Sequence, residues 1–156
     1  MEIRRINNSE SELVVNLFDK YRIFYKKSPD IDLARNFIRE RLANNESIIF
    51  VALEKQGDQE IPVGFTQLYP TYSSVRAVKN WILNDLYVES DQRKKGIGEN
   101  LIKAAIAFAK DNGAAYVQLE TAIDNHTAQS LYETIGFKKQ KPDDSYFVYR
   151  IDVDRQ

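Results

Sequence analysis

Cysteine is missing from the sequence altogether. Without thiols the chain cannot carry a disulfide scaffold, a thiolate zinc site or a cysteine nucleophile, and we expect no metal. Long apolar runs are missing too, since no stretch approaches the about 20 residues that a membrane-spanning helix needs. Residues 1–7 alternate charged and apolar side chains and lack the apolar core of a signal peptide. We therefore expect a cytoplasmic protein with no membrane partner.

An excess of charge of either sign is also missing. The 22 Lys and Arg side chains nearly balance the 23 Asp and Glu side chains, which leaves a formal net charge of −1. No overall field attracts nucleic acid, so we expect no nucleic-acid partner. No repeat, low-complexity tract or linker divides the chain, and 43% hydrophobic residues are enough for a core. We predict a single domain over residues 1–156.

Hydrophobic periodicity predicts an alternation of strands and helices. The segments with strand composition are residues 2–6, 47–54, 62–69, 80–89, 115–121, 137–140 and 146–152. Four segments have helical spacing; they begin near Asn8 or Ser9, near Asp30 or Asp32, at Ile97, and at Asn125 or Thr127. The predicted order is β-α-α-β-β-β-α-β-α-β-β. This order describes an α/β (α+β) fold with a mixed, mostly antiparallel central sheet and flanking helices.

Local signals set the ends of these elements. Ser9 and Glu12 have the spacing of a capping box for the first helix. Pro70 is expected to end the strand over residues 62–69. Gly113 and Gly136 follow the last two helices in the position where a glycine commonly ends a helix.

The chain is organised around residues 80–112, where a strand leads through a basic turn into a long helix. The turn carries Arg93, Lys94 and Lys95 and then two close glycines, Gly96 and Gly98. The first backbone N–H groups of a helix have no intrahelical acceptor, and the helix dipole adds about half a positive charge there. Such a helix end attracts phosphate.

Two familiar phosphate-binding motifs do not fit this turn. A Walker loop requires Gly-x-x-x-x-Gly-Lys followed by Ser or Thr, and no stretch of the chain has that spacing. A dinucleotide fingerprint would require a third glycine where the chain has Leu101. Its strand would also open the fold, whereas here it follows an antiparallel meander.

The hexapeptide from Arg93 to Gly98 resembles the acetyl-CoA motif of the GNAT superfamily of N-acetyltransferases, which reads Gln or Arg, two residues, Gly, any residue, then Gly or Ala. Downstream, Asn125 and the segment "LYETIGF" at residues 131–137 resemble the second signature of that family. The predicted order of elements agrees with the family over nearly the whole chain. The segments "LYPTYSS" and "NDLYV" look like those of its polyamine- and diamine-type branch.

The resemblance implies that acetyl-CoA is a co-substrate. Backbone amides from Arg93 to Glu99 would bind its pyrophosphate, and Asn125 would hydrogen-bond its pantetheine arm. The strand before the motif would carry a bulge and splay from the next strand, exposing backbone groups of Tyr87 and Val88. The residues that the resemblance assigns to this cofactor are Tyr87, Val88, Arg93, Lys94, Lys95, Gly96, Ile97, Gly98, Glu99, Asn125 and Tyr132.

The resemblance also assigns catalytic roles. The phenol of Tyr132 would stabilise or protonate the leaving thiolate, although a tyrosine there can also anchor its helix in the core. A base must accept protons from the amine, and the polyamine-type branch often has a glutamate where this chain has Asn84. Asparagine cannot accept a proton. Asp85 is the expected base, and Glu120 is the alternative.

The acceptor pocket is expected to use Tyr25, Tyr72, Trp81 and Glu120, because aromatic walls attract a cationic amine. The predicted function is transfer of an acetyl group to a primary amine of a small molecule or peptide, by direct attack in a ternary complex. The alternative is a non-catalytic acyl-CoA-binding or regulatory domain. The aromatic-rich segment over residues 146–149 suggests a homodimer interface.

Overall fold

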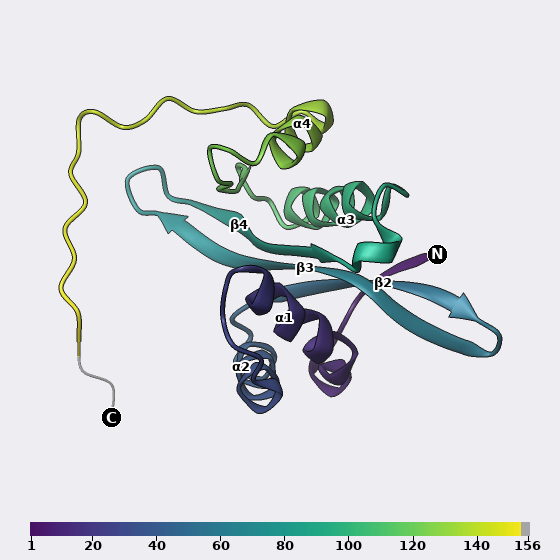
Figure 1. Cartoon of the computed structure of the whole chain (residues 1–156). Helices are drawn as coiled ribbons and strands as arrows, with labels where there is room; N and C mark the ends of the chain where they lie inside the picture. The colour runs from purple at the N-terminus through teal and green to yellow at the C-terminus, as the bar shows by residue number, and fades with distance from the viewer. Residues whose placement is uncertain (154–156) are drawn as a thin grey trace. The chain divides into compact units, whose positions relative to one another are not determined.

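The computed structural model describes residues 1–153 (Figure 1). The chain divides into two compact units, Met1–Glu120 and Thr121–Gln156, which are described one at a time. No helix in the described part of the chain combines the length and hydropathy that crossing a bilayer requires.

A five-stranded sheet forms the centre of the first unit. Its strands are β1 (Glu2–Arg5), β2 (Ile48–Gln56), β3 (Gln59–Ser73), β4 (Val78–Val88) and β5 (Val117–Gln118), and they lie in the order β1-β2-β3-β4-β5. The first four strands pair antiparallel, and β4 pairs with β5 in parallel. The predicted mixed, mostly antiparallel sheet is therefore confirmed.

Helices cover both faces of this sheet (Figure 1). On one face lie α1 (Glu12–Phe24) and α2 (Ile31–Ala43), and on the other lies α3 (Ile97–Asp111). Two single 3₁₀ turns, η1 (Asn8–Glu10) and η2 (Ser90–Gln92), precede α1 and follow β4.

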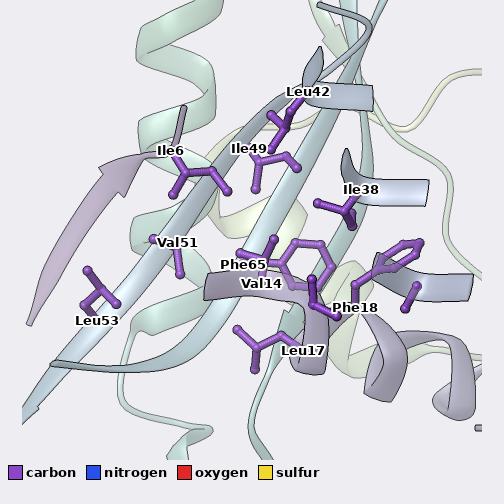
Figure 2. Close-up of a cluster of buried hydrophobic side chains, with 12 residues drawn as sticks. Ile6, Val14, Leu17, Phe18, Ile38, Leu42, Ile49, Val51, Leu53 and Phe65 are labelled. Atoms are coloured by element: carbon purple, nitrogen blue, oxygen red, sulfur yellow. The ribbon is translucent and has the colours of Figure 1, made fainter. Parts of the chain in front are cut away.

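The larger core cluster fills the space between the sheet and the α1 and α2 helices (Figure 2). It consists of buried aliphatic and aromatic side chains, namely Ile6, Val14, Val15, Leu17, Phe18, Ala34, Ile38, Leu42, Ile49, Val51, Leu53 and Phe65. On the opposite face, Ala52 and Val63 pack against Ile97 and Leu101 of α3. The helical spacing that predicted the α3 core face is confirmed by this packing.

Gly64 brings α3 close to the sheet. A Cβ atom at this position would lie 3.0 Å from the carbonyl oxygen of Tyr87 and 3.3 Å from side-chain atoms of Ile97 and Leu101. Only a residue without a side chain leaves the β4 backbone and the start of α3 where they are. This glycine therefore positions the turn that leads into α3.

The start of the first helix differs from the prediction. The capping box is formed by Asn7 and Glu10 around η1, and α1 begins later, at Glu12. Asn7 Oδ1 accepts a hydrogen bond from Ser9 N at 2.9 Å, so Asn7 has the capping role that Ser9 was expected to have. At α2 the expected cap is confirmed, because Asp30 Oδ1 accepts from Leu33 N at 3.1 Å.

Pro70 does not end its strand, contrary to the prediction. β3 continues to Ser73, with Pro70 opposite Trp81 of β4. The pairing of β3 with β2 ends at Leu68, so Pro70 lies where β3 has a neighbour on one side only. A missing N–H is tolerated at such an edge position.

Over its described residues, 121–153, the second unit contains one helix, α4 (His126–Ile135), which ends at Gly136 with a φ of +124°, as predicted. The expected strands over residues 137–140 and 146–152 are wrong, since residues 137–153 carry no strand. Strand composition alone does not make a strand, because its backbone groups must pair with a neighbour. Residues 138–153 are all exposed instead.

Candidate active site

The loop between β4 and α3 is held by its own basic side chains. Arg93 Nε donates to the carbonyl oxygen of Val88 at 2.9 Å, and its guanidinium lies 5.7 Å from the ring centre of Tyr87. Lys95 Nζ donates to Gln92 Oε1 at 3.2 Å. These contacts stabilise the loop, so the Arg93 and Lys95 side chains are at least partly engaged within it.

The start of α3 offers unpaired backbone donors. Gly96 is its N-cap residue, with a φ of +82°, and no side chain caps the helix. The first-turn N–H groups of Ile97, Gly98 and Glu99 therefore lack intrahelical acceptors. No atom lies within 4 Å of where a Cβ of Gly96 would be, so the approach is open. This end of α3 fits a phosphate group.

Glu99 places a negative charge in that same first turn. Its carboxylate is paired with Lys103 one turn further along α3, at 2.9 Å. The pairing offsets the repulsion that Glu99 would exert on an incoming anion.

β4 and β5 separate soon after they meet. Their parallel pairing covers only Trp81 with Val117 and Ile82 with Gln118. From Leu83 to Val88, β4 pairs with β3 alone, so its other edge carries backbone groups without a strand partner. An extended ligand can pair with such an edge. The splay that the family resemblance implied is present in the structure.

A bulge in β4 lies beside this free edge. The register between β3 and β4 shifts at Asn84, which has no partner on β3. The next residue, Asp85, is only 2% exposed. Its carboxylate accepts hydrogen bonds from Gln67 Nε2 and, at 2.8 Å, from Asn84 Nδ2. The bulge thus buries a carboxylate that two side-chain amides hold in place.

Two phenols complete this cluster. Tyr21 Oη donates to the carbonyl oxygen of Asn84 at 3.2 Å, and its phenol also interacts with Asp85. Burial raises the pKa of Asp85, against the opposing hydrogen bonds from Asn84, Gln67 and Tyr21. Burial and the nearby Asp85 charge both raise the pKa of Tyr21 and of Tyr69. We call Asp85, Gln67, Asn84, Tyr21 and Tyr69 the acid cluster.

Sequence reasoning identified Asp85 but missed three members of the acid cluster. Tyr21 was expected on the apolar face of its helix, as core or as an aromatic wall of the acceptor pocket. Tyr69 was expected at the end of a strand, where a segment flanking that pocket begins, and Gln67 only in that strand. One signal was available, because Thr66 and Gln67 are polar residues inside an apolar strand and a buried polar side chain needs a partner. Both are fully buried, and both bond to Asp85.

The expected acceptor residues lie on different faces of the sheet. Tyr25, at the end of α1, packs edge-on against Tyr21 at 5.0 Å, on the same side as Asp85. Trp81 is 5% exposed and packs on Phe108 of α3, 5.1 Å between ring centres. Tyr72 and Trp81 both lie against the Lys79 ammonium, at 5.7 and 4.8 Å. The structure therefore does not bring Tyr25 together with Tyr72 and Trp81.

Glu120 is exposed, two residues beyond the end of β5. Asp85 differs clearly from Glu120, the alternative base, because two side-chain amides donate hydrogen bonds to the Asp85 carboxylate.

The second unit carries the remaining two expected residues on α4. Asn125 is the N-cap residue, and its Oδ1 accepts from Ala128 N at 3.2 Å. Tyr132 is half-buried, with its ring 6.0 Å from that of Phe137. Because α-helices repeat every 3.6 residues, the two side chains start from the same side of α4. Among residues 1–153 there is no group of three or more side chains suited to hold a metal ion.

Comparison with known protein families shows which family this chain belongs to. A model of the "Acetyltransferase (GNAT) family" matches residues 12–137. The chain belongs to the GNAT family of acetyltransferases. This GNAT protein is 42% identical over 139 residues to the "Uncharacterized N-acetyltransferase YhfO" of Bacillus subtilis (strain 168), covering 89% of this chain and 91% of that protein. It is also 27% identical to a "Probable acetyltransferase" of Haemophilus influenzae, with 88% and 90% of the two chains covered.

Solved structures agree with this assignment. A crystal structure described as that of a probable acetyltransferase superposes with a TM-score of 0.87 at 34% identity, covering 97% of this chain and 99% of that one. An aminoglycoside N-acetyltransferase in complex with CoA has a TM-score of 0.76 at 18% identity, covering 96% and 93% of the two chains, which shows the shared fold. This GNAT protein is therefore an N-acetyltransferase enzyme.

Proposed function

We propose that this GNAT enzyme transfers the acetyl group of acetyl-CoA to a primary amine of a small molecule or peptide, by direct attack in a ternary complex. The observation that carries the proposal is the uncapped start of α3 beside the free edge of β4. The first supplies donors for a pyrophosphate, and the second supplies backbone groups for an extended pantetheine chain.

Within the proposed acetyl-CoA site, the part that would bind the pyrophosphate has more structural support than the part that would bind the pantetheine chain. The N–H groups of Ile97, Gly98 and Glu99 would hold the pyrophosphate, while Lys94 adds positive charge from the loop. Further along, backbone groups of Tyr87 and Val88 would pair with the pantetheine amides. By the family motif, Asn125 would add a side-chain hydrogen bond.

The amine must lose protons during the reaction. An alkylammonium with a pKa near 10.4 is neutral in about one part in two thousand at pH 7, a burden of about 4.5 kcal/mol. Asp85 has a raised pKa, which brings a carboxylate closer to the operating range of a general base. Because Gln67 and Asn84 occupy its oxygens, we infer that Asp85 takes the proton through the Tyr21 phenol or a water molecule.

The leaving group needs a proton in the same reaction. The amine nitrogen attacks the thioester carbonyl, the C–S bond breaks, and the thiolate would take its proton from the Tyr132 phenol. The ammonium group loses one proton to Asp85 before the attack and a second during it, and the second restores the Tyr132 phenol through water. The products are therefore an amide, free CoA thiol and one proton, which Asp85 releases to solvent. No covalent enzyme intermediate is required.

A cationic acceptor of the polyamine or diamine type suits the α1 side of the site. Tyr21 and Tyr25 present aromatic rings there, and the buried charge of Asp85 attracts an ammonium group. The "LYPTYSS" and "NDLYV" segments support the same branch. The net charge of −1 supports an enzyme without a nucleic-acid partner. The pattern of residues 1–7 and the lack of cysteine support a cytoplasmic enzyme.

One observation favours the second candidate, a non-catalytic acyl-CoA-binding domain. Asp85 is almost completely buried, and both of its carboxylate oxygens accept hydrogen bonds from the protein. A carboxylate held in this way can serve structure alone.

A release assay for free thiol, run over a panel of amines, separates the two candidates. Wild type is compared with Tyr132→Phe and with Tyr116→Phe as the matched control, and calorimetry measures CoA binding to all three. We expect CoA to bind each protein, with the amine-dependent rate lost only in Tyr132→Phe. Binding without turnover of any amine would support the second candidate, and absence of CoA binding would overturn both.

A further inference from the structure

An ion pair joins α1 to the residue at which the loop between β4 and α3 begins. Lys20 of α1 donates to both carboxylate oxygens of Glu89, at 3.0 and 2.9 Å. Glu89 directly follows β4, and the two residues are 69 positions apart in the chain. Both lie in the first unit. The pair therefore fixes one contact between α1 and the start of this loop.

The backbone of Glu89 lies close to the start of α3. Its N–H donates to the carbonyl oxygen of Val63 at 2.9 Å, and its own carbonyl oxygen accepts from Gln92 N at 2.9 Å. Gly64 is the next residue of β3, and a Cβ there would lie 3.3 Å from a side-chain atom of Ile97, the first residue of α3. Glu89 and the start of α3 therefore border the same short part of β3.

A carboxylate at this place opposes the binding of phosphate. The start of α3 is the proposed pyrophosphate site, and charges of the same sign repel one another. Asp91 in η2 adds a second negative charge near Lys20. Uncompensated, these carboxylates would weaken the attraction of the helix end for an anion. Lys20 supplies a compensating cation.

The basic side chains of the loop are paired differently. Arg93 donates to the carbonyl oxygen of Val88, and Lys95 donates to the side-chain oxygen of Gln92. Both acceptors are neutral, so the positive charges of Arg93 and Lys95 remain available to a phosphate. Lys20 is instead matched to a carboxylate.

The charge on Lys20 is secure, but the ion pair is not needed for folding. The hydrogen bond with Glu89 raises the pKa of Lys20, and burial opposes this only in part. The two side chains are 50% and 22% exposed. An ion pair with this exposure contributes little to the free energy of unfolding. Its loss should therefore change the local charge while the fold is kept.

We propose that Lys20 is a positioning residue for acetyl-CoA: by neutralising Glu89, it prevents the start of the loop from repelling the phosphates of the cofactor. This inference rests on the proposed function, because it concerns the same phosphate site. Lys20 acts through Glu89 and takes no part in the chemical step. Removing the carboxylate should therefore compensate for removing the cation.

Calorimetry of CoA binding at low salt tests this compensation. Lys20→Met keeps the aliphatic stem and removes the charge, so the Kd should rise about three- to tenfold. Lys20→Met combined with Glu89→Gln should bind CoA within about twofold of wild type, because neither charge is left. Lys20→Arg should also keep the affinity of wild type. The loss of an anchoring contact could not be repaired by removing its second partner.

Salt and kinetics give two further measurements. Raising the ionic strength from about 0.01 to 1 M shortens the screening length from about 30 to 3 Å, so the difference between Lys20→Met and wild type should vanish. In the thiol-release assay, Lys20→Met should raise the KM for acetyl-CoA about three- to tenfold and leave kcat within about twofold, because the acid cluster is intact. A general loosening of the structure would lower kcat as well.

Arg35→Met is the matched control. Arg35 of α2 pairs with Glu12 of α1 at 2.9 Å, so this variant also removes one positive charge from an ion pair that involves α1. We expect its CoA affinity to stay within about twofold of wild type. Circular dichroism of each variant checks that the fold is kept.

Three results would overturn the inference and leave the proposed function intact. The first is wild-type CoA affinity in Lys20→Met. The second is a double variant that binds CoA no better than Lys20→Met, which would mean that the ion pair matters as a contact and not for its charge. The third is an equal loss in Arg35→Met. Failure of wild type to bind CoA would instead overturn the proposed function, and this inference with it.

Discussion

Residues 62–69 and residues 146–152 have similar strand composition, but only the first segment is a strand. Residues 62–69 lie within β3, between β2 and β4, and their backbone pairs on both sides over most of that length. Residues 146–152 have no strand partner, and their side chains lie in solvent. Composition therefore predicts the capacity to form a strand, while a neighbouring strand decides whether one forms.

The same contrast applies to polar groups. In the acid cluster, Asp85 is buried and holds hydrogen bonds from Gln67 and Asn84. At the start of α3, no side chain caps the helix. A buried group with partners serves the fold or a proton relay, whereas uncapped donors at a helix start are available to a ligand. The two regions should therefore respond differently to substitution.

The largest effect is expected in the acid cluster. Asp85→Asn keeps the shape of the side chain but removes the base, so turnover should fall about 10²- to 10⁴-fold. CoA affinity should stay within about threefold, since the start of α3 is unchanged. Thiol release and calorimetry measure the two quantities, with Asp58→Asn in the exposed turn between β2 and β3 as control. Unchanged turnover would remove Asp85 from the mechanism.

A smaller effect is expected where α3 packs on the sheet. Gly64→Ala introduces a Cβ that would lie 3.0 Å from the Tyr87 carbonyl oxygen, so the free energy of unfolding should fall by about 1–3 kcal/mol. CoA affinity should fall as well, because the β4 edge and the start of α3 move apart. Gly57→Ala separates backbone strain from packing, because Gly57 has a φ of +66° but its Cβ would meet no atom within 4 Å, so this variant should lose stability and keep its CoA affinity. An equal loss of CoA affinity in both variants would contradict the packing argument.

The sequence predicted most elements of the first unit because their signals are local. Helical spacing predicted α3, Gly113 its end, and Asp30 the start of α2. The phosphate-binding loop from Arg93 to Gly98 could also be predicted, because its basic residues and glycines lie close together in the chain.

What the sequence did not predict depends on contacts between distant residues. Tyr21 and Asn84 are 63 positions apart in the chain, and Gln67 and Asp85 are 18 apart. Neither pair has a local pattern. Pro70 was placed wrongly for the same reason, because its tolerance depends on where β2 stops pairing with β3.

The pH dependence of stability tests the burial of Asp85. Its pKa is raised above 3.8 in the folded state, so the folded protein binds more protons than the unfolded chain just above that pH. The Asp85 contribution to stability should therefore decline as pH rises from 3.8 to the folded pKa and then stay constant. Each tenfold difference in the proton equilibrium corresponds to about 1.4 kcal/mol. Asp85→Asn should lack this decline.

Urea unfolding of wild type and Asp85→Asn between pH 3.5 and 8 measures this effect. We expect the stability of the variant relative to wild type to increase with pH and then level off. A difference that stays constant over the whole range would mean that Asp85 titrates alike in the folded and unfolded chains.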